Sequence, residues 1–285
     1  MKFLFKSRKL ELGSRTLVMG IHNATPDSFS DGGNYKDVNS AVAHCLQMLK
    51  DGADIIDIGG ESTRPGDTSI LSIDDELDRI LPIISGLRKA SPDCIISVDT
   101  MKPEVAGEAI RLGADIINDV SGLKHSKDIA KIAAETNAGL VIMHMKTTPK
   151  TNKHDYNYEN LVKEVSDALV KSAELAESYG VNKNSILLDP GLGGGTFGKS
   201  AEQSLELIAK ILEIKKLEYP VLLGSSRKGF LGKLINEPEP KNRLSANMAV
   251  VAWAALKKVD IIRVHDVKET CQFLKAFNHL QFYEI

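Results

Sequence analysis

Polar residues that could do chemistry stand at the ends of short apolar runs throughout this sequence. About eight runs rich in Val, Ile and Leu are closed by an Asp, Asn, Arg or His, and helical stretches separate them. The clearest of these end residues are Asp57, Asp99, Asn118, Asp189 and Arg263. The alternation is typical of a (β/α)8 barrel, in which the carboxyl ends of the strands and the loops after them build one active site. We therefore predict an enzyme with an α/β fold, a TIM barrel that forms a single domain over residues 1–285.

The elements that must position these residues follow from the apolar pattern. Strands are predicted at 16–20, 53–58, 94–98, 114–118, 140–143, 185–188, 221–223 and 260–264. Helices are predicted at 38–50, 73–90, 103–112, 127–136, 161–179, 203–217, 244–256 and 268–279. The segment 52–57 recurs with similar residue types at 113–118, and in both copies a polar residue closes a buried strand. Because a buried polar group needs a partner or a ligand, we expect Asp57, Asn118 and Arg263 to face a ligand.

Composition excludes several classes of protein. The 36 Lys and Arg residues are balanced by 38 Asp and Glu residues, so no broad basic surface for nucleic acid is expected. Cys45, Cys94 and Cys271 lie far apart, which argues against a disulfide framework and a zinc site. No apolar run is long enough to cross a bilayer or to act as a signal peptide. We expect a cytoplasmic protein that binds small molecules and has neither a membrane nor a nucleic-acid partner.

A first group of residues has the chemistry of a phosphate or diphosphate site. Thr63 and Arg64 place a hydroxyl and a guanidinium on a short loop that Pro65 stiffens. Arg263 and His265 share one face of an extended segment and add two further donors. Asn23 offers a neutral oxygen of the kind that helps to hold Mg²⁺, which keeps most of its waters and takes oxygens from substrate phosphates. The alternative for this residue is an Asn that only stabilises a turn.

A second group suits a flat heterocycle. Asp99, Asn118 and Asp189 would bring acceptor-rich side chains together at the mouth of the barrel. A carboxylate accepts paired N–H donors from an aminopyrimidine edge, and an amide both donates and accepts. Lys228 adds a donor to a ring carbonyl or nitrogen, and Met143 adds a soft contact to the ring face. For Asp189, a purely structural role as the cap of the following Pro-Gly turn stays open.

The segment 193–200 matches the spacing G-x-x-x-x-G-K-[ST] of a nucleotide-binding P-loop. The chain has no other nucleotide-binding feature, so a flexible loop on the substrate side of the barrel is preferred to an ATP site.

Two long segments resemble the signatures of one family. Residues 19–33 closely resemble the first signature of dihydropteroate synthases, and residues 57–66 resemble the second. Shorter matches at 97–100, 117–119, 188–191, 226–228 and 263–266 follow in the order of that family, so the resemblance covers nearly the whole chain. It implies a cytoplasmic (β/α)8 barrel, usually a homodimer, that makes folate precursors and is the target of sulfonamides. The reaction it implies joins 4-aminobenzoate to (7,8-dihydropterin-6-yl)methyl diphosphate with Mg²⁺ as cofactor, and releases diphosphate.

The resemblance also implies roles for individual residues. The pterin ring would be held by Asp99, Asn118, Asp189, Lys228 and Met143. Mg²⁺ would meet Asn23, and the diphosphate would meet Asn23, Thr63, Arg64, Arg263 and His265. The aminobenzoate pocket would be shaped by Phe29, Asp31, Thr63, Pro65 and Gly229. Catalysis would rest on Asp99, Arg263, His265, Lys228 and Arg64, which stabilise the departing diphosphate and a pterin cation in a dissociative, SN1-like step. No nucleophilic residue is required.

Three departures from the family pattern concern the edges of this site. His22 stands beside Asn23 where the family usually has an aliphatic residue, and residues 194–196 lengthen the loop before Phe197. Gly229 follows Lys228 where many members have a Ser that helps to hold the aminobenzoate carboxylate, so a backbone N–H at a helix start is expected to do so here. These changes bear on aminobenzoate and sulfonamide affinity. Asp57 and Glu61 belong to the strand-end pattern, but neither is given a specific part in binding or catalysis.

Two other functions compete with a synthase. A pterin-binding methyltransferase barrel would have a similar ring pocket but no leaving diphosphate. The segments 63–65, 227–228 and 263–265 argue against it. A pterin-binding regulatory protein would be expected to lack the loop residues, yet Phe29, Asp31 and Pro65 are present.

Overall fold

The computed structural model describes residues 1–24, 35–61, 71–146, 157–193 and 197–282. Eight parallel strands form one sheet in the order β8-β7-β6-β5-β4-β3-β10-β9. Their bounds are β3 (Leu17–Asn23), β4 (Ile55–Gly59), β5 (Ile96–Asp99), β6 (Ile116–Asp119), β7 (Gly139–Met143), β8 (Ile186–Asp189), β9 (Leu222–Leu223) and β10 (Ile261–Val264). A single isolated bridge between Leu188 and Val221 joins β8 to the segment leading into β9 and closes the ring. The predicted (β/α)8 barrel is confirmed.

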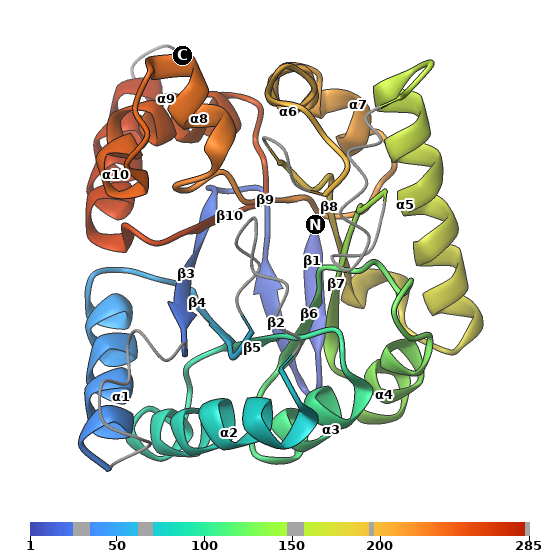
Figure 1. Ribbon diagram of the computed structural model, residues 1–285, viewed down its shortest axis with the longest axis vertical. Helices are drawn as coiled ribbons and strands as arrows, with labels where there is room; N and C mark the ends of the chain where they lie inside the picture. The colour runs from blue at the N-terminus through green and yellow to red at the C-terminus, as the bar shows by residue number, and fades with distance from the viewer. Residues whose placement is uncertain (25–34, 62–70, 147–156, 194–196, 283–285) are drawn as a thin grey trace.

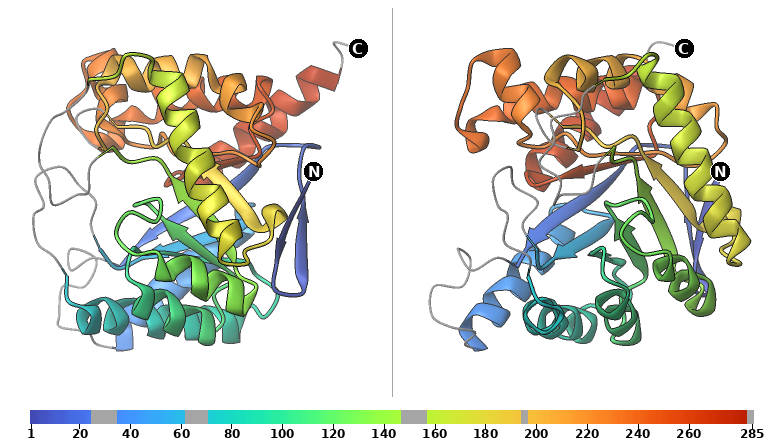
Figure 2. Two further views of the ribbon diagram at one scale, coloured as in Figure 1. Left: turned by 90° about the vertical axis from the view of Figure 1, so that its right-hand side faces the viewer. Right: turned by 45° about the vertical axis from the view of Figure 1, so that its right-hand side comes forward.

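Helices surround the sheet on its outer side (Figure 1; Figure 2). They are α1 (Tyr35–Lys50), α2 (Ile73–Ala90), α3 (Pro103–Arg111), α4 (Asp128–Thr136), α5 (Leu161–Ser178), α6 (Ala201–Ala209), α7 (Ile211–Lys215), α8 (Gly229–Ile235), α9 (Leu244–Leu256) and α10 (Val267–Phe282). The single helix predicted at 203–217 is wrong, because the chain breaks at Lys210 into α6 and α7. Short 3-10 turns lie at Lys183–Ser185 and Pro240–Arg243. None of the helices in the described part of the chain has the length and apolar character needed to cross a membrane.

Alternation along the strands explains why the polar residues share one layer. Inside the barrel, one buried cluster gathers apolar residues from around the ring: Leu17, Met19, Ile55, Ile95, Ile116, Val141, Leu187, Leu222 and Ile261. Side chains return to the same face of a strand every second residue. The next inward positions are therefore Asp57 after Ile55, Asn118 after Ile116, Asp189 after Leu187 and Arg263 after Ile261. The barrel interior is apolar at its base and polar at the strand ends.

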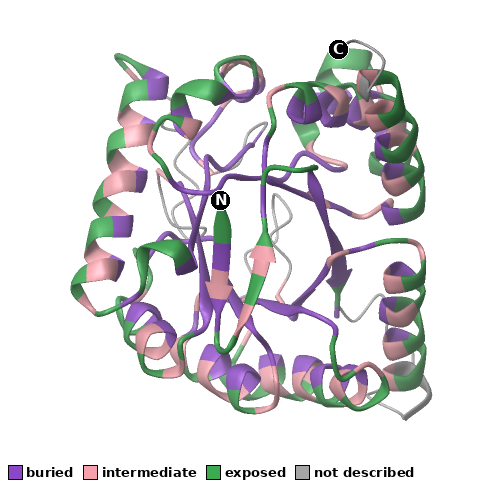
Figure 3. Ribbon diagram, turned by 180° about the vertical axis from the view of Figure 1, so that it is seen from behind, coloured by how far each residue is buried: buried purple, intermediate pink, exposed green. Residues whose placement is uncertain are grey.

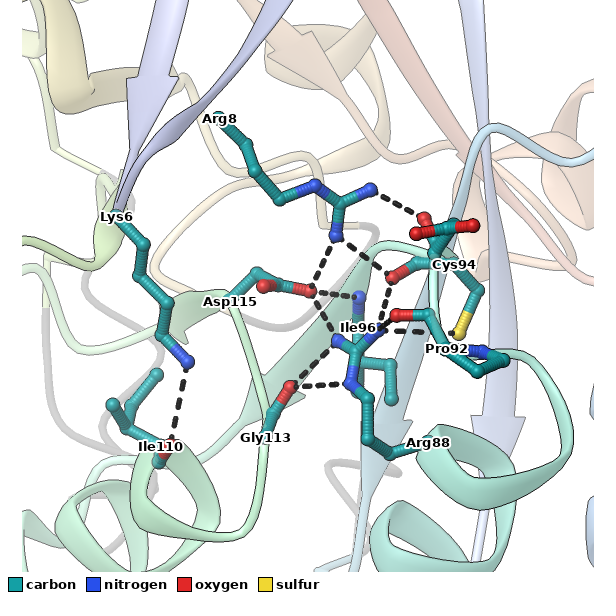
Figure 4. Close-up of polar contacts among 10 residues, drawn as sticks. Lys6, Arg8, Arg88, Pro92, Cys94, Ile96, Ile110, Gly113 and Asp115 are labelled. Carbon is teal, nitrogen blue, oxygen red and sulfur yellow. Dashed lines mark hydrogen bonds and ion pairs between the residues drawn. The ribbon is translucent and has the colours of Figure 1, made fainter.

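An antiparallel hairpin, not predicted from the sequence, covers the base of the barrel. Its strands are β1 (Lys2–Phe5) and β2 (Arg8–Glu11), and Figure 3 shows it lying across the barrel opening. Phe3 and Phe5 are almost wholly buried in the same cluster as the apolar layer. Arg8 donates to the carbonyl of Cys94, while Arg88 forms an ion pair with Asp115 at 2.7 Å in the same cluster of contacts (Figure 4). The hairpin thus closes the end opposite the polar layer.

Candidate active site

Arg263 connects two carboxylates at the strand ends. Its Nε donates to Asp57 Oδ2 at 2.6 Å, and its Nη2 donates to Asp99 Oδ2 at 2.6 Å. Asn118 Nδ2 donates to the same oxygen of Asp57 at 3.1 Å. Four of the residues predicted to face a ligand therefore form one continuous network, although they come from β4, β5, β6 and β10.

Asp57 holds this network together from beneath. Its side chain is completely buried, and it accepts hydrogen bonds from Arg263 and Asn118 with one oxygen. Its other oxygen, Oδ1, has no hydrogen-bond partner among the described residues. Because a buried charge must be paired, Asp57 fixes the guanidinium and the amide in place. Sequence reasoning left this residue without a role because its partners lie far away along the chain.

Asp99 differs from Asp57 in that it reaches the open side of the network. Its side chain is 14% exposed, whereas that of Asp57 is fully buried. Burial and, to a smaller extent, the charge of Asp57 raise the pKa of Asp99 to about 7, against the opposing effect of the Arg263 charge. A largely buried carboxylate that is held by an arginine is suited to accept N–H donors from a heterocycle.

Asp189 and Lys228 form a second pair of groups, which follow strands β8 and β9. Asp189 Oδ1 accepts a hydrogen bond from the backbone N–H of Gly191 at 2.7 Å. Asp189 therefore caps the Pro-Gly turn, which is the structural role that the sequence left open. Lys228 Nζ donates to the carbonyl of Leu192 at 2.8 Å. Burial raises the pKa of Asp189, and burial also lowers the pKa of Lys228 to about 8, which Asp189 partly offsets. Each group therefore supports the charged form of the other.

Met143 lies in a small apolar cluster beside this pair. The cluster contains Val120, Met143 and Met145, with Met101 and Phe197 packed against it. Lys228 Nζ lies 5.2 Å from the centroid of the Phe197 ring. The sequence left the position of Phe197 in doubt because of the lengthened loop. Its ring lies beside Met143 and Lys228, where thioether and aromatic groups offer a flat surface.

His265 and Arg227 lie after β10 and β9. His265 Nδ1 is 3.1 Å from Ser226 Oγ, and burial with the nearby Arg227 and Arg263 charges lowers the pKa of His265 to about 3. His265 is therefore an uncharged hydrogen-bonding group at neutral pH. Arg227 forms an ion pair with Asp266 at 2.5 Å, which connects the two segments.

Asn23 ends β3 with an exposed side chain. In register it lies opposite Gly59, which in turn lies opposite Asp99, so it stands on the same rim of the barrel. Among the described residues, no group of three or more His, Cys, Asp or Glu side chains could hold a metal ion. A neutral amide oxygen fits a Mg²⁺ ion that keeps its waters and is bound mainly by substrate phosphates. Asn23 therefore fits a Mg²⁺ ion that is bound in this way.

His22 points away from Asn23 and toward helix α1. Its Nδ1 is 3.1 Å from Nδ1 of His44, and burial lowers the pKa of His22 to about 4. The family departure at this position therefore changes the packing between β3 and α1 and leaves the barrel interior unaltered.

The lysine of the P-loop-like segment is buried and contacts the protein itself. Lys199 is fully buried, and its Nζ lies 2.7 Å from Nδ1 of His144 and 3.1 Å from the His144 carbonyl. Ser200 caps helix α6 with its side chain. Because both residues are committed to the protein itself, the geometry argues against an ATP site here.

Gly229 is the remaining predicted site residue in the described part of the chain. Gly229 is exposed and begins helix α8 directly after Lys228. Five residues lie outside the described part of the chain: Phe29, Asp31, Thr63, Arg64 and Pro65.

Comparison with known proteins places this barrel in a family. The model of the family described as "Pterin binding enzyme" matches residues 19–265. A curated dihydropteroate synthase from Synechocystis is 42% identical over 94% of this chain and 91% of its own length. The chain belongs to the dihydropteroate synthase family. The matches confirm the predicted family and the predicted transferase function.

Solved structures of dihydropteroate synthases agree with this assignment. One from Clostridium difficile, obtained in the presence of pteroic acid, has a TM-score of 0.87 and 42% identity, and the match covers 95% of this chain and 98% of that one. One from Xanthomonas albilineans with 4-aminobenzoic acid has a TM-score of 0.88 and 38% identity, and 98% of each chain is covered. The sequence resemblance and the fold therefore point to the same family.

Proposed function

We propose that this protein condenses (7,8-dihydropterin-6-yl)methyl diphosphate with 4-aminobenzoate, giving 7,8-dihydropteroate and diphosphate. One observation carries the proposal: Asp99, assigned to the ring, and Arg263, assigned to the diphosphate, are joined at 2.6 Å. The bond that breaks in this reaction lies between the ring and the diphosphate. A site for that reaction therefore needs its ring-binding and diphosphate-binding groups side by side.

The ring-binding part consists of Asp99, Asn118, Asp189, Lys228 and Met143. The two carboxylates accept the N–H groups of the aminopyrimidine edge, and Lys228 donates to a ring carbonyl or nitrogen. In the proposed step, the bond from the methylene carbon to the diphosphate oxygen breaks, and both electrons leave with the oxygen. Asp99 and Asp189 stabilise the positive charge that develops on the pterin, because their carboxylates are largely buried and lie on the ring-binding side of the site.

The diphosphate-binding part comprises Arg263, His265, Thr63, Arg64 and Asn23. Arg263 stabilises the departing negative charge, and the neutral His265 donates a hydrogen bond. When bound through Asn23 and the diphosphate, Mg²⁺ would supply further neutralisation of that charge. The amine of 4-aminobenzoate, placed by Phe29, Asp31, Thr63, Pro65 and Gly229, then forms the C–N bond and releases a proton. A homodimer and a cytoplasmic location, both implied by the family, complete the proposal.

The reaction itself is the first test. We expect purified protein with the pterin diphosphate and Mg²⁺ to release diphosphate and form dihydropteroate in equal amounts when 4-aminobenzoate is present. Diphosphate would be measured with a coupled phosphate assay, and dihydropteroate by chromatography. Ring binding without any product that depends on 4-aminobenzoate would refute the synthase and favour a regulatory pterin-binding protein.

The pH dependence of the reaction should report Lys228. Burial lowers the pKa of this ammonium to about 8, so it is protonated below that pH and loses its proton above it. We expect kcat/KM for the pterin diphosphate to fall as the pH rises through about 8, since this parameter follows the free enzyme. Arginine keeps its charge throughout this range, so Lys228→Arg should show no such fall even if its activity is lower. A wild-type profile that stays flat to pH 10 would contradict this role.

A further inference from the structure

Lys199 joins the chain after β8 to the chain after β7. Its Nζ lies 2.7 Å from Nδ1 of His144 and donates to the His144 carbonyl at 3.1 Å. His144 directly follows β7, and its backbone N–H donates at 2.8 Å to the carbonyl of Asp189, the last residue of β8. We call Lys199 and His144 the Lys199–His144 pair. Neither side chain has a part in the proposed reaction, although the pair adjoins residues that have one.

Lys199 is fully buried, and it is held there by neutral groups. Its hydrogen bonds go to the ring and the carbonyl of His144, and no ion pair with an Asp or Glu is found for it in the described part of the chain. Burial lowers its pKa well below the usual value, although the charge of Asp189 opposes this shift. A buried amine without an opposite charge is costly, and an apolar side chain of similar length would avoid that cost. Stability alone therefore does not account for an amine at this position.

The carbonyl that accepts from Lys199 lies where two chain segments approach each other closely. A Cβ atom on Gly191 would lie 2.1 Å from the His144 oxygen and 3.2 Å from Met143 Cγ. Gly191 also has a positive φ of 67°, so this turn requires glycine for two reasons. The backbone N–H of the same glycine donates to Asp189 Oδ1. A shift of the His144 carbonyl would therefore disturb Met143 and Asp189, which are both proposed to bind the ring.

The backbone just before Lys199 is strained. Phe197 has a positive φ of 57°, which is unfavourable for a bulky residue and persists only when its surroundings hold it. Gly198 follows with a φ of 71°, and its carbonyl accepts from the hydroxyl of Tyr158 at 3.0 Å. On the other side of Lys199, Ser200 begins helix α6 with a complete capping box. The Lys199 amine thus ties this strained turn to the end of β7.

The strained turn places the Phe197 ring in the ring-binding part of the site. Phe197 packs against the apolar cluster that contains Met143, and Lys228 Nζ lies 5.2 Å from its ring centroid. Met143 and Lys228 are both assigned to the pterin ring. An aromatic side chain in this position can contact the flat face of a heterocycle. The position of Phe197 therefore connects the Lys199–His144 pair with ring binding.

We propose that Lys199 is a positioning residue: by holding the ring and the carbonyl of His144, it keeps Phe197 and Met143 in the places from which they contact the pterin ring. The inference rests on the proposed function, because ring binding by this part of the barrel belongs to it. The lysine of the P-loop-like segment then serves ring affinity instead of binding a nucleotide phosphate. Loss of its amine should weaken ring binding and leave the fold and diphosphate binding as they are.

Binding measurements on the full-length protein test this role. Lys199→Met keeps the length of the side chain, and we expect its affinity for a hydroxymethylpterin without diphosphate to fall about tenfold by calorimetry, the scale of one hydrogen bond. Its affinity for inorganic diphosphate with Mg²⁺ should be unchanged. The melting temperature should stay within a few degrees, because removal of a costly buried amine offsets the lost donor. Lys199→Gln keeps an N–H donor on a chain one atom shorter and should lose only about threefold in pterin affinity.

Lys215→Met is the matched control. Lys215 Nζ forms an ion pair at 2.8 Å with Asp260, which directly precedes β10 and so lies at the opposite end of that strand from the polar layer. Its removal leaves the buried Asp260 carboxylate without this partner, so the melting temperature should fall. Pterin affinity should stay that of the wild type. The same substitution is thus expected to lower affinity at Lys199 and stability at Lys215.

A double-mutant cycle tests whether Lys199 acts through Phe197. Phe197→Leu keeps an apolar side chain but loses the aromatic face, so pterin affinity should fall about tenfold. Adding Lys199→Met to Phe197→Leu should cause little further loss. Fully additive losses would overturn the proposal, as would wild-type pterin affinity in Lys199→Met.

A second variant keeps the test decisive if Lys199→Met does not fold. Lys199→Gln then takes its place in the cycle, and full additivity with Phe197→Leu counts against the proposal in the same way. All of these probes measure binding without turnover. A wild type that binds the pterin but makes no dihydropteroate would therefore count against the proposed function alone.

Discussion

Arg263→Ala is expected to reduce kcat/KM for the pterin diphosphate about a thousandfold. The variant loses the guanidinium that is proposed to bind the diphosphate and that contacts Asp99, which is proposed to bind the ring. Loss of a single preorganised donor to a developing negative charge costs on the order of a hundredfold to a thousandfold in rate. Arg263 also orients Asp99 through the contact at 2.6 Å, so its loss disturbs the ring-binding side as well. Steady-state kinetics at saturating 4-aminobenzoate would measure the effect.

Stability must be separated from catalysis in this variant. Removing Arg263 leaves the buried carboxylate of Asp57 with only the amide of Asn118, which is expected to lower the free energy of unfolding by a few kcal/mol, about 3. Adding Asp57→Asn removes that unpaired charge. The double variant should therefore recover much of the melting temperature without recovering turnover. Arg263→Ala with unchanged kinetics would refute the role assigned to this residue.

Asp189→Asn should weaken pterin binding by about a thousandfold, because an amide presents an N–H group where the ring needs an acceptor. The side chain is 5% exposed and already accepts the N–H of Gly191, so it has little freedom to turn. Loss of its charge also removes a group that raises the pKa of Lys228, so the ammonium would lose its proton at lower pH. Fluorescence titration with a pterin would measure the affinity.

Asp119 offers a matched control for this substitution. It also ends a strand and is fully buried, but its oxygens accept the backbone N–H groups of Ser121 at 2.8 Å and Leu123 at 2.6 Å. Asp119→Asn should lower the melting temperature and leave pterin affinity close to that of the wild type. Equal losses of pterin affinity in the two variants would show that Asp189 acts only through the local fold.

The strand ends were predictable because two simple rules act together. Parallel strands end at the same rim, and side chains alternate along each strand, so an apolar run closed by a polar residue places that residue in the barrel mouth. Asp99, Asn118, Asp189 and Arg263 follow these rules and converge as predicted. The roles proposed for them still depend on the family.

Features that depend on distant partners could not be read from the sequence. Asp57 meets Arg263 across 206 positions, so its task was visible only once the barrel closed. The N-terminal hairpin was missed because its turn lacks an Asn-Gly or Asp-Gly signal; Lys6 adopts a positive φ of 50° there instead. Burial, together with the charges of Arg227 and Arg263, lowers the pKa of His265 to about 3, and these surroundings appear only in the folded chain.

Strands β8 and β9 are joined less extensively than the other neighbouring strands of the barrel, and we call their boundary the seam. The other neighbouring strands pair through continuous ladders, but here the connection is the single bridge between Leu188 and Val221. Asp189 ends β8 on one side of the seam, and Lys228 follows β9 on the other and reaches back to the Leu192 carbonyl. A pterin held by both residues would act as a cross-link over the seam. If the substrate binds as proposed, it should therefore stabilise the boundary between β8 and β9, which is joined by one isolated bridge.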